Sequence, residues 1–248
     1  MVPVFSKMMF EDKEELVRAQ AASALGLFVY IGELEAIPSF SHRKIEDDLL
    51  KVLNGSDTAL VRRRALESLG FSSREEIPAV IRKAYNDADP QWLASALFAM
   101  GRSADEQWED SILNNLDYSD ADVQVEAIRA AGQLELASAR ESLLKKIAEP
   151  EDLDVDLRAA VVWSLSQIGG EGVREALDQL YDDTEDEDEA EYIEDALDNL
   201  SFTDDVESLG MLGFPINEED RLNTIIDVNE KEGDEEGGNH KHRKKKRD

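Results

Sequence analysis

The ten residues VRRRALESLG at positions 61–70 decide the fold, because the same phrase occurs six times along the 248-residue chain. Apolar or small side chains recur at offsets four, five and eight from an apolar anchor, which is the spacing of one helix face. Glycine or serine follows at offset nine. Such self-similarity predicts a solenoid of stacked helical units. The anchors of the six copies are Val17, Val61, Trp92, Val123, Leu157 and Tyr192.

A second apolar pattern follows most copies of the phrase. In four repeats a triad of apolar residues spaced by four begins 16 residues after the anchor, as in Val61 and Ile77. In the first repeat the distance from Val17 to Ile45 is 28 residues, which indicates an insertion of 12 residues at 31–42. The repeating unit is therefore a helical hairpin, and the pattern predicts an all-α solenoid of about five to six hairpins. Met1, Phe5 and Met9 have the triad spacing, which predicts a helix of the second type at the start.

Two sets of residues are assigned by their place in this pattern. Aspartates before the phrases can accept hydrogen bonds from the first N–H groups of a helix, so we expect them to be N-caps. These are Asp57, Asp89, Asp120 and Asp154. The three tryptophans occupy positions of the apolar pattern, and we expect them in the core. They are Trp92, Trp108 and Trp163.

The composition divides the chain into three parts. Residues 1–202 hold the repeats, residues 203–238 are acidic with few apolar clusters, and residues 239–248 form a basic end. The middle part is predicted to be disordered, because it lacks the apolar residues for a core. The chain has a net charge of −30, and the basic end contributes +5, so the first 238 residues carry −35. A body of this charge favours basic or apolar partners over nucleic acid.

The sequence contains few residues of the kinds, histidine and cysteine above all, that catalysis or metal binding often requires. It has no cysteine, which excludes disulfides, thiolate zinc sites and cysteine nucleophiles. It has no apolar run of membrane-spanning length and no convincing signal peptide, so we expect a cytoplasmic protein. The three histidines are His42, His240 and His242, each followed by a basic residue. We therefore predict no catalytic residue, cofactor or metal ligand, and no enzyme activity.

The phrases VRAQAASALG, VRRRALESLG and LRAAVVWSLSQIG resemble the HEAT-like repeats of the phycobilisome-lyase type. The resemblance extends over about 200 residues and implies a HEAT-like α-solenoid (an armadillo-like helical fold). That lineage includes bilin lyases, deoxyhypusine hydroxylase and many scaffold proteins. The hydroxylase holds two irons with paired His-Glu motifs, which this sequence lacks, so the resemblance does not carry that activity over.

In such solenoids the second helices line the concave face, and their outward residues are candidates for binding a partner. These are Lys51, Lys83, Asn114, Lys145 and Gln179. The insertion adds the candidates Leu34, Ile37 and Phe40. The spacing also predicts intrahelical ion pairs between Asp47 and Lys51 and between Glu141 and Lys145.

The sequence therefore favours a non-catalytic scaffold that binds a partner protein or peptide on its concave face, and the acidic charge favours a basic partner. Two alternatives stay open. One is a bilin-lyase-like accessory protein that handles a tetrapyrrole. The other is nucleic-acid contact through the basic end, which predicts a steep salt dependence that disappears when residues 239–248 are deleted.

Overall fold

The computed structural model describes residues 1–150 and 153–211, and their side chains as far as residue 202. In these residues there are twelve α-helices, two short 3-10 helices and no strand. The helices are α1 (Val2–Glu11), α2 (Glu15–Glu33), α3 (Ser39–Leu53), α4 (Ala59–Leu69), α5 (Ile77–Tyr85), α6 (Pro90–Arg102), η1 (Glu106–Trp108), α7 (Glu109–Leu113), α8 (Ala121–Gln133), η2 (Ala137–Ala139), α9 (Arg140–Ile147), α10 (Val155–Ile168), α11 (Val173–Asp183) and α12 (Glu187–Met211).

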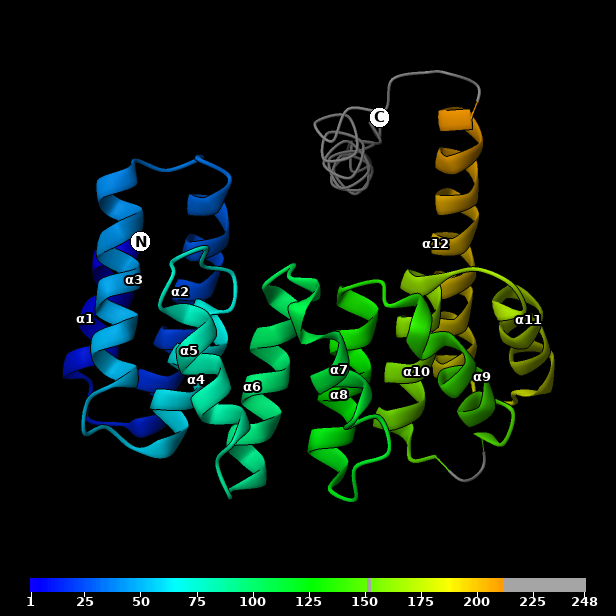
Figure 1. The fold of residues 1–248 in the computed structure, drawn as a ribbon, viewed down its shortest axis with the longest axis horizontal. Coiled ribbons are helices and arrows are strands. Elements are labelled where there is room, and N and C mark those ends of the chain that lie inside the picture. Colours follow the sequence, from blue (N-terminus) through cyan, green and yellow to red (C-terminus); the bar gives the residue numbers. More distant parts are fainter. Residues whose placement is uncertain (151–152, 212–248) are drawn as a thin grey trace, which may run out of the picture. The chain divides into compact units, whose positions relative to one another are not determined.

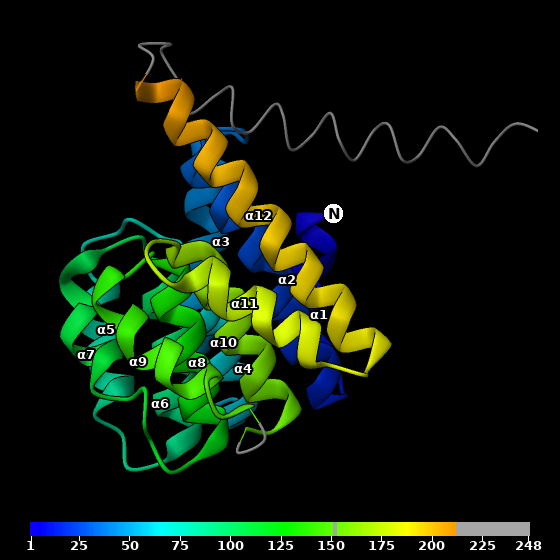
Figure 2. The ribbon, with the colours of Figure 1, turned by 90° about the vertical axis from the view of Figure 1, so that its right-hand side faces the viewer.

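The helices pair into hairpins that follow one another in chain order, as Figure 1 shows from α2 and α3 through α10 and α11. The first five phrases lie on the first helices of hairpins, and the triads that follow lie on or beside the second helices, while the sixth phrase lies on α12. Figure 2 looks along the stack from the end that carries α11. The predicted all-α solenoid is confirmed. None of the described helices combines the length and apolarity needed to cross a bilayer.

The chain divides into two compact units, Met1–Leu200 and Ser201–Asp248. The first unit contains the hairpins and the first part of α12. In the second unit the structure describes residues 201–211, which continue α12 as a helix. Residues 203–211 belong to the segment predicted to be disordered, and residues 212–248 lie outside the described part of the chain.

The buried core follows the repeat pattern. The residues at offset eight of the first five phrases, Leu25, Leu69, Met100, Ala131 and Leu165, are all 0% exposed. The triads of the second helices are buried too, except that Tyr85 is half-buried and Tyr181 is 40% exposed. The hairpins therefore share one continuous hydrophobic core, as a stack of repeats requires.

The first helices approach one another closely at the glycines of offset nine. A Cβ added to Gly70 would lie 2.8 Å from Ala99 Cα, and one added to Gly101 would lie 2.9 Å from Ala130 Cα. Neighbouring first helices are also joined by a buried hydrogen bond, in which Ser68 Oγ donates to the Ala22 carbonyl at 2.8 Å. The absence of a side chain at offset nine thus sets the spacing of the first-helix layer.

Three of the four expected N-caps are confirmed. Asp89, Asp120 and Asp154 each accept a hydrogen bond from a backbone N–H in the first turn of the following helix. Asp57 is different, because the residue at the N-cap of α4 is Thr58. Asp57 instead accepts two hydrogen bonds from Arg18, at 2.8 Å from Nη2 and 3.0 Å from Nε. This carboxylate therefore joins α2 to the start of α4.

The Arg18–Asp57 pair makes a pH-dependent contribution to stability. The hydrogen bonds from Arg18 hold the pKa of Asp57 below its ordinary value, although burial opposes them. The stabilisation is then present above the ordinary pKa of aspartate and is lost as the pH falls through the lowered pKa. We expect Asp57→Asn to reduce the free energy of unfolding by about 1–2 kcal/mol at pH 7, less than for a fully buried pair. Urea unfolding from pH 7 to pH 3 should show the difference between the two proteins shrinking, and a constant difference would contradict the assignment.

The insertion at 31–42 lengthens the two helices of the first hairpin more than it lengthens their loop. The first helix α2 continues to Glu33, and α3 begins at Ser39. Glu35 has a left-handed φ of 58°, while Glu35 N–H donates to the Gly32 carbonyl and Ala36 N–H to the Ile31 carbonyl. This is a usual way for a helix to end. The short connection is therefore an ordered extension of the hairpin.

Candidate functional site

A groove runs along the outward sides of the first helices within residues 1–200. It consists of two adjoining parts of about 420 and 680 Å³, which share Phe98, Glu126 and Arg129. Most of its walls are side chains at offsets two, three and six of the phrases, and residues at the helix starts, such as Asp122 and Tyr192, complete them. We call it the first-helix groove and define it by Arg63, Arg64, Glu67, Ser95, Phe98, Asp122, Glu126, Arg129, Trp163, Tyr192 and Asp195.

This groove lies on the first helices, whereas the sequence predicts partner binding on the second helices. The pocket beside Lys83 has a volume of about 60 Å³, and Arg62 and Trp92 of the first helices line it too. A Cβ at Gly70 or Gly101 would meet the backbone of the next first helix, so the first helices pack closely against one another. The outward residues of the phrases therefore line the first-helix groove.

One part of the groove is polar and fixed by hydrogen bonds. Glu67 is only 6% exposed, and its carboxylate accepts from Arg64 Nη1 at 2.6 Å and from Ser95 Oγ at 2.7 Å. Arg102 Nη1 donates to the Glu67 backbone carbonyl at 3.2 Å. Both carboxylate oxygens of Glu67 are thus satisfied, which gives this part of the groove a rigid floor.

Glu126 and Arg63 keep hydrogen-bonding capacity in the same part. Glu126 Oε1 accepts from Arg129 Nη1 at 3.3 Å, whereas the buried Oε2 has no hydrogen-bond partner. Burial raises the pKa of Glu126 above its ordinary value, and the charge of Arg129 opposes that rise. Arg63 Nη2 donates to Gln91 at 2.9 Å, but its Nε is buried without a partner. One buried acceptor and one buried donor in this part of the groove therefore have no hydrogen-bond partner.

The other part of the groove is apolar and aromatic. Trp163 was expected in the core, but its side chain is 39% exposed and lines this part together with Phe98 and Tyr192. Its offset of six places it on the outward side of α10. Burial, with Glu189 nearby, raises the pKa of Tyr192 to about 12, so this phenol is uncharged at neutral pH. An exposed tryptophan beside other rings is typical of a surface that binds a partner.

The five predicted partner-binding residues of the second helices, which are Lys51, Lys83, Asn114, Lys145 and Gln179, are all exposed. The expected pair of Glu141 and Lys145 is confirmed at 2.7 Å. The expected pair of Asp47 and Lys51 is wrong, since Asp47 pairs with Arg74 and Lys51 Nζ lies 5.0 Å from the centre of the Phe10 ring. A partner-binding role for this row stays a prediction.

The three predicted residues of the insertion are placed differently from one another. Leu34 is 49% exposed and Phe40 is 82% exposed, whereas Ile37 packs against the core. Ile37 and Phe40 line a cavity of about 910 Å³ between the ends of α2 and α3, and Leu34 lies outside it. Their role in binding stays a prediction too.

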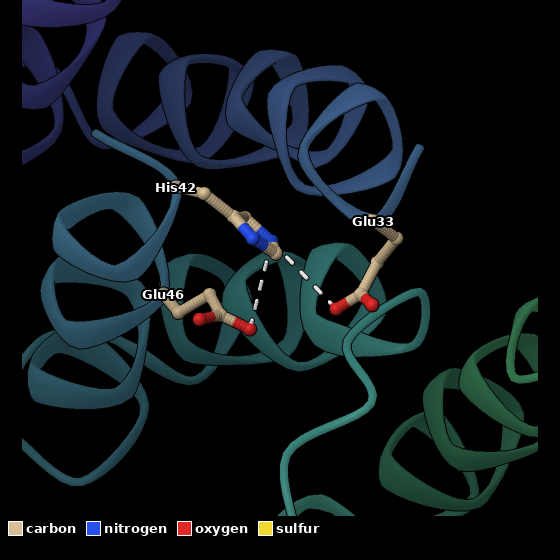
Figure 3. Close-up of side chains that lie close together, drawn as sticks. All are labelled: Glu33, His42 and Glu46. Carbon is tan, nitrogen blue, oxygen red and sulfur yellow. Dashed lines mark ion pairs between the residues drawn. The ribbon is translucent and has the colours of Figure 1, made fainter. Parts of the chain in front are cut away.

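The same cavity contains three side chains that the sequence does not bring together. His42 on α3 lies between Glu33, at the end of α2, and Glu46, one turn further along α3 (Figure 3). His42 Nε2 is 3.6 Å from Glu33 Oε1 and 3.7 Å from Glu46 Oε1. His42 and Glu46 are four residues apart, and the sequence alone shows this spacing, which is typical of neighbours on one helix face. Glu33 lies close to them only because the insertion lengthens α2 and α3. The basic end, with His240 and His242, lies outside the described residues.

Comparison with known proteins gives a family-model match to part of the chain and likenesses of fold to solved structures, among them the two described next. Residues 109–198 match the model of HEAT repeats, and no curated protein sequence matches the chain. The crystal structure of an engineered protein is 18% identical, covering 81% of this chain and 96% of its own, with a TM-score of 0.45. Human deoxyhypusine hydroxylase in complex with glycerol is 17% identical, covering 81% of this chain and 84% of its own, with a TM-score of 0.39. The finer phycobilisome-lyase type stays a prediction. Taken with the hairpins described above, the family match identifies the fold as an all-α solenoid with HEAT repeats at residues 109–198.

Proposed function

We propose that the protein is a non-catalytic scaffold that binds a basic segment of a partner protein in the first-helix groove. The observation that carries the proposal is the continuity of the groove from the polar floor at Glu67 to the exposed Trp163. HEAT repeats generally serve protein–protein interaction, so a protein partner fits the family match.

The charge of the groove favours a basic segment. The residues that define it include four acidic and three basic side chains, and Asp154 and Asp156 beside them add two more acids, on a chain of net charge −30. Glu126 Oε2 lacks a donor, which a lysine or arginine of the partner would supply. Arg63 Nε lacks an acceptor, which a backbone carbonyl would supply. A basic segment offers both groups, and a charged hydrogen bond is stronger than a neutral one.

The aromatic part of the groove favours an apolar residue in the same segment. Trp163, Phe98 and Tyr192 surround this part, and Ala159 and Ala160 beside them leave space for a side chain. The segment we infer is therefore basic, with at least one large apolar residue that packs on Trp163.

Fluorescence anisotropy with labelled peptides of equal length tests the proposal. One peptide carries lysines, arginines and one leucine, and the other has aspartate and glutamate in place of the basic residues. We expect the basic peptide to bind, more weakly at high salt, and the acidic peptide not to bind. Glu126→Gln together with Asp122→Asn should weaken binding about tenfold, since both remove charge from the groove.

A matched control uses the second-helix row. A variant with Lys51, Lys83 and Lys145 changed to alanine should bind the basic peptide with unchanged affinity. If this variant lost binding while the Glu126→Gln, Asp122→Asn protein bound normally, the binding site would lie on the second helices. Equal binding of the acidic and basic peptides would contradict the proposal.

A further inference from the structure

His42 is held in an unusual position between two carboxylates, away from the first-helix groove. Its Nε2 is buried and has no hydrogen-bond partner. The distances of 3.6 and 3.7 Å to Glu33 and Glu46 are beyond the usual length of an N–H···O hydrogen bond. An unprotonated Nε2 facing two carboxylates would be repelled by them, so the arrangement favours a cation there, either a proton on Nε2 or a metal ion between the three groups.

The distances suit a metal ion. Zinc binds imidazole nitrogen and carboxylate oxygen at about 2.0–2.2 Å, and tetrahedral angles then separate ligand atoms by about 3.3–3.5 Å. One ligand atom from each of Glu33, His42 and Glu46 can be chosen so that all lie within 4.8 Å of one another. Only a small inward movement is needed. Two carboxylates and a neutral imidazole also balance the charge of a divalent ion.

The surroundings hold the two carboxylates in place. Glu46 has a side chain only 4% exposed, and its Oε1 accepts a hydrogen bond from Ser72 Oγ. Glu33 Oε1 accepts from the Ser73 backbone N–H at 2.9 Å. The nearby Arg74 is hydrogen-bonded to Asp47 and Glu76, and its Nη1 is 3.9 Å from Glu46 Oε2. Hydrogen bonds to ligating carboxylates are typical of metal sites in proteins.

Glycine at position 32 makes room for the imidazole. A Cβ added to Gly32 would lie 2.3 Å from His42 Cδ2, so any larger residue would displace the ring. Gly32 is in the last turn of α2, beside Glu33. The absence of a side chain at Gly32 thus leaves the space that the His42 ring occupies.

We propose that Glu33, His42 and Glu46 bind a divalent transition-metal ion, for which Zn²⁺ is the probe. Imidazole with carboxylates suits Zn²⁺ and its first-row neighbours better than Ca²⁺, which prefers oxygen ligands alone. Three protein ligands leave one tetrahedral position open toward the cavity beside Phe40 and Arg43. The site connects the two helices of the first hairpin, and its ion stabilises that hairpin.

Calorimetric titration with Zn²⁺ tests the site in the full chain. The reference protein carries His240→Ala and His242→Ala, because these two histidines in the basic end are other possible ligands. We expect the reference to bind one Zn²⁺ and to unfold at a higher temperature with Zn²⁺. Its Co²⁺ form should show visible absorption bands. Adding His42→Ala should abolish the binding and the bands.

Two further variants separate the site from a general effect of charge. Ser72→Ala removes the hydrogen bond to Glu46 and should weaken Zn²⁺ binding about tenfold. Asp48→Asn removes a carboxylate of the same helix that pairs with Lys44 and should leave the affinity unchanged. Circular dichroism checks that each variant is folded. If His42→Ala does not fold, the Zn²⁺ affinity of Ser72→Ala tests the site instead. Absence of Zn²⁺ binding in the reference protein, or binding unaffected by both His42→Ala and Ser72→Ala, would overturn the proposal.

Discussion

Replacing Gly70 by alanine is expected to lower the free energy of unfolding by about 1–3 kcal/mol. The added Cβ would lie 2.8 Å from both the Cα and the carbonyl oxygen of Ala99. These are backbone atoms of α6, so no side chain can rotate away and the two first helices must separate. The better helix propensity of alanine, up to about 1 kcal/mol, offsets only part of this cost. Urea unfolding followed by circular dichroism measures the change.

Ser166 provides the matched control for Gly70. It occupies offset nine of the fifth phrase, where the structure already accommodates a Cβ, and its hydroxyl donates only to the nearby Trp163 carbonyl. Ser166→Ala should therefore cost about 1 kcal/mol or less. Equal losses in the two variants would mean that the close approach of the first helices does not set their spacing.

Replacing Trp163 by alanine should weaken binding of the basic peptide by about 30-fold or more, which corresponds to about 2 kcal/mol. The indole is the largest exposed side chain in the aromatic part of the groove, and no other residue there can replace its area. The affinity is measured by anisotropy at a temperature where circular dichroism shows both proteins folded. A change of less than threefold would contradict the role given to this residue.

Phe40 is the control for Trp163. It is an aromatic residue with 82% exposure, outside the first-helix groove, and the sequence predicts it to bind a partner. Phe40→Ala should leave the peptide affinity unchanged. A large loss in this variant instead would favour the insertion as the binding surface.

The repeated phrase was sufficient to predict the hairpins, because burial requires the same apolar spacing in every repeat. Its residues at offset eight are buried in all six copies, from Leu25 to Leu200. The apolar spacing alone could not predict which side of the stack carries the groove, since it does not show how closely the layers of first and second helices pack. The glycines at offset nine were the available signal, and they point to the first helices.

The site residues were harder to predict for two different reasons. Trp163 fits an apolar pattern, and an exposed apolar residue cannot be distinguished from a core residue until the helix face is known. Glu33 and His42 are nine positions apart on different helices, so only the path of the insertion brings them together. Asp57 shows the same limit, because its partner Arg18 is 39 positions away.

The indole N–H signals of the three tryptophans test the central claim, which is that a basic segment binds in the first-helix groove. Trp163 lines the aromatic part, while Trp92 is half-buried outside the groove and Trp108 is 2% exposed. Phenylalanine variants assign the three signals in a ¹H–¹⁵N spectrum, and the basic peptide is then titrated. We predict that the Trp163 signal shifts with saturation and that the signals of Trp92 and Trp108 stay in place. Binding of the peptide with no shift of the Trp163 signal would contradict the account.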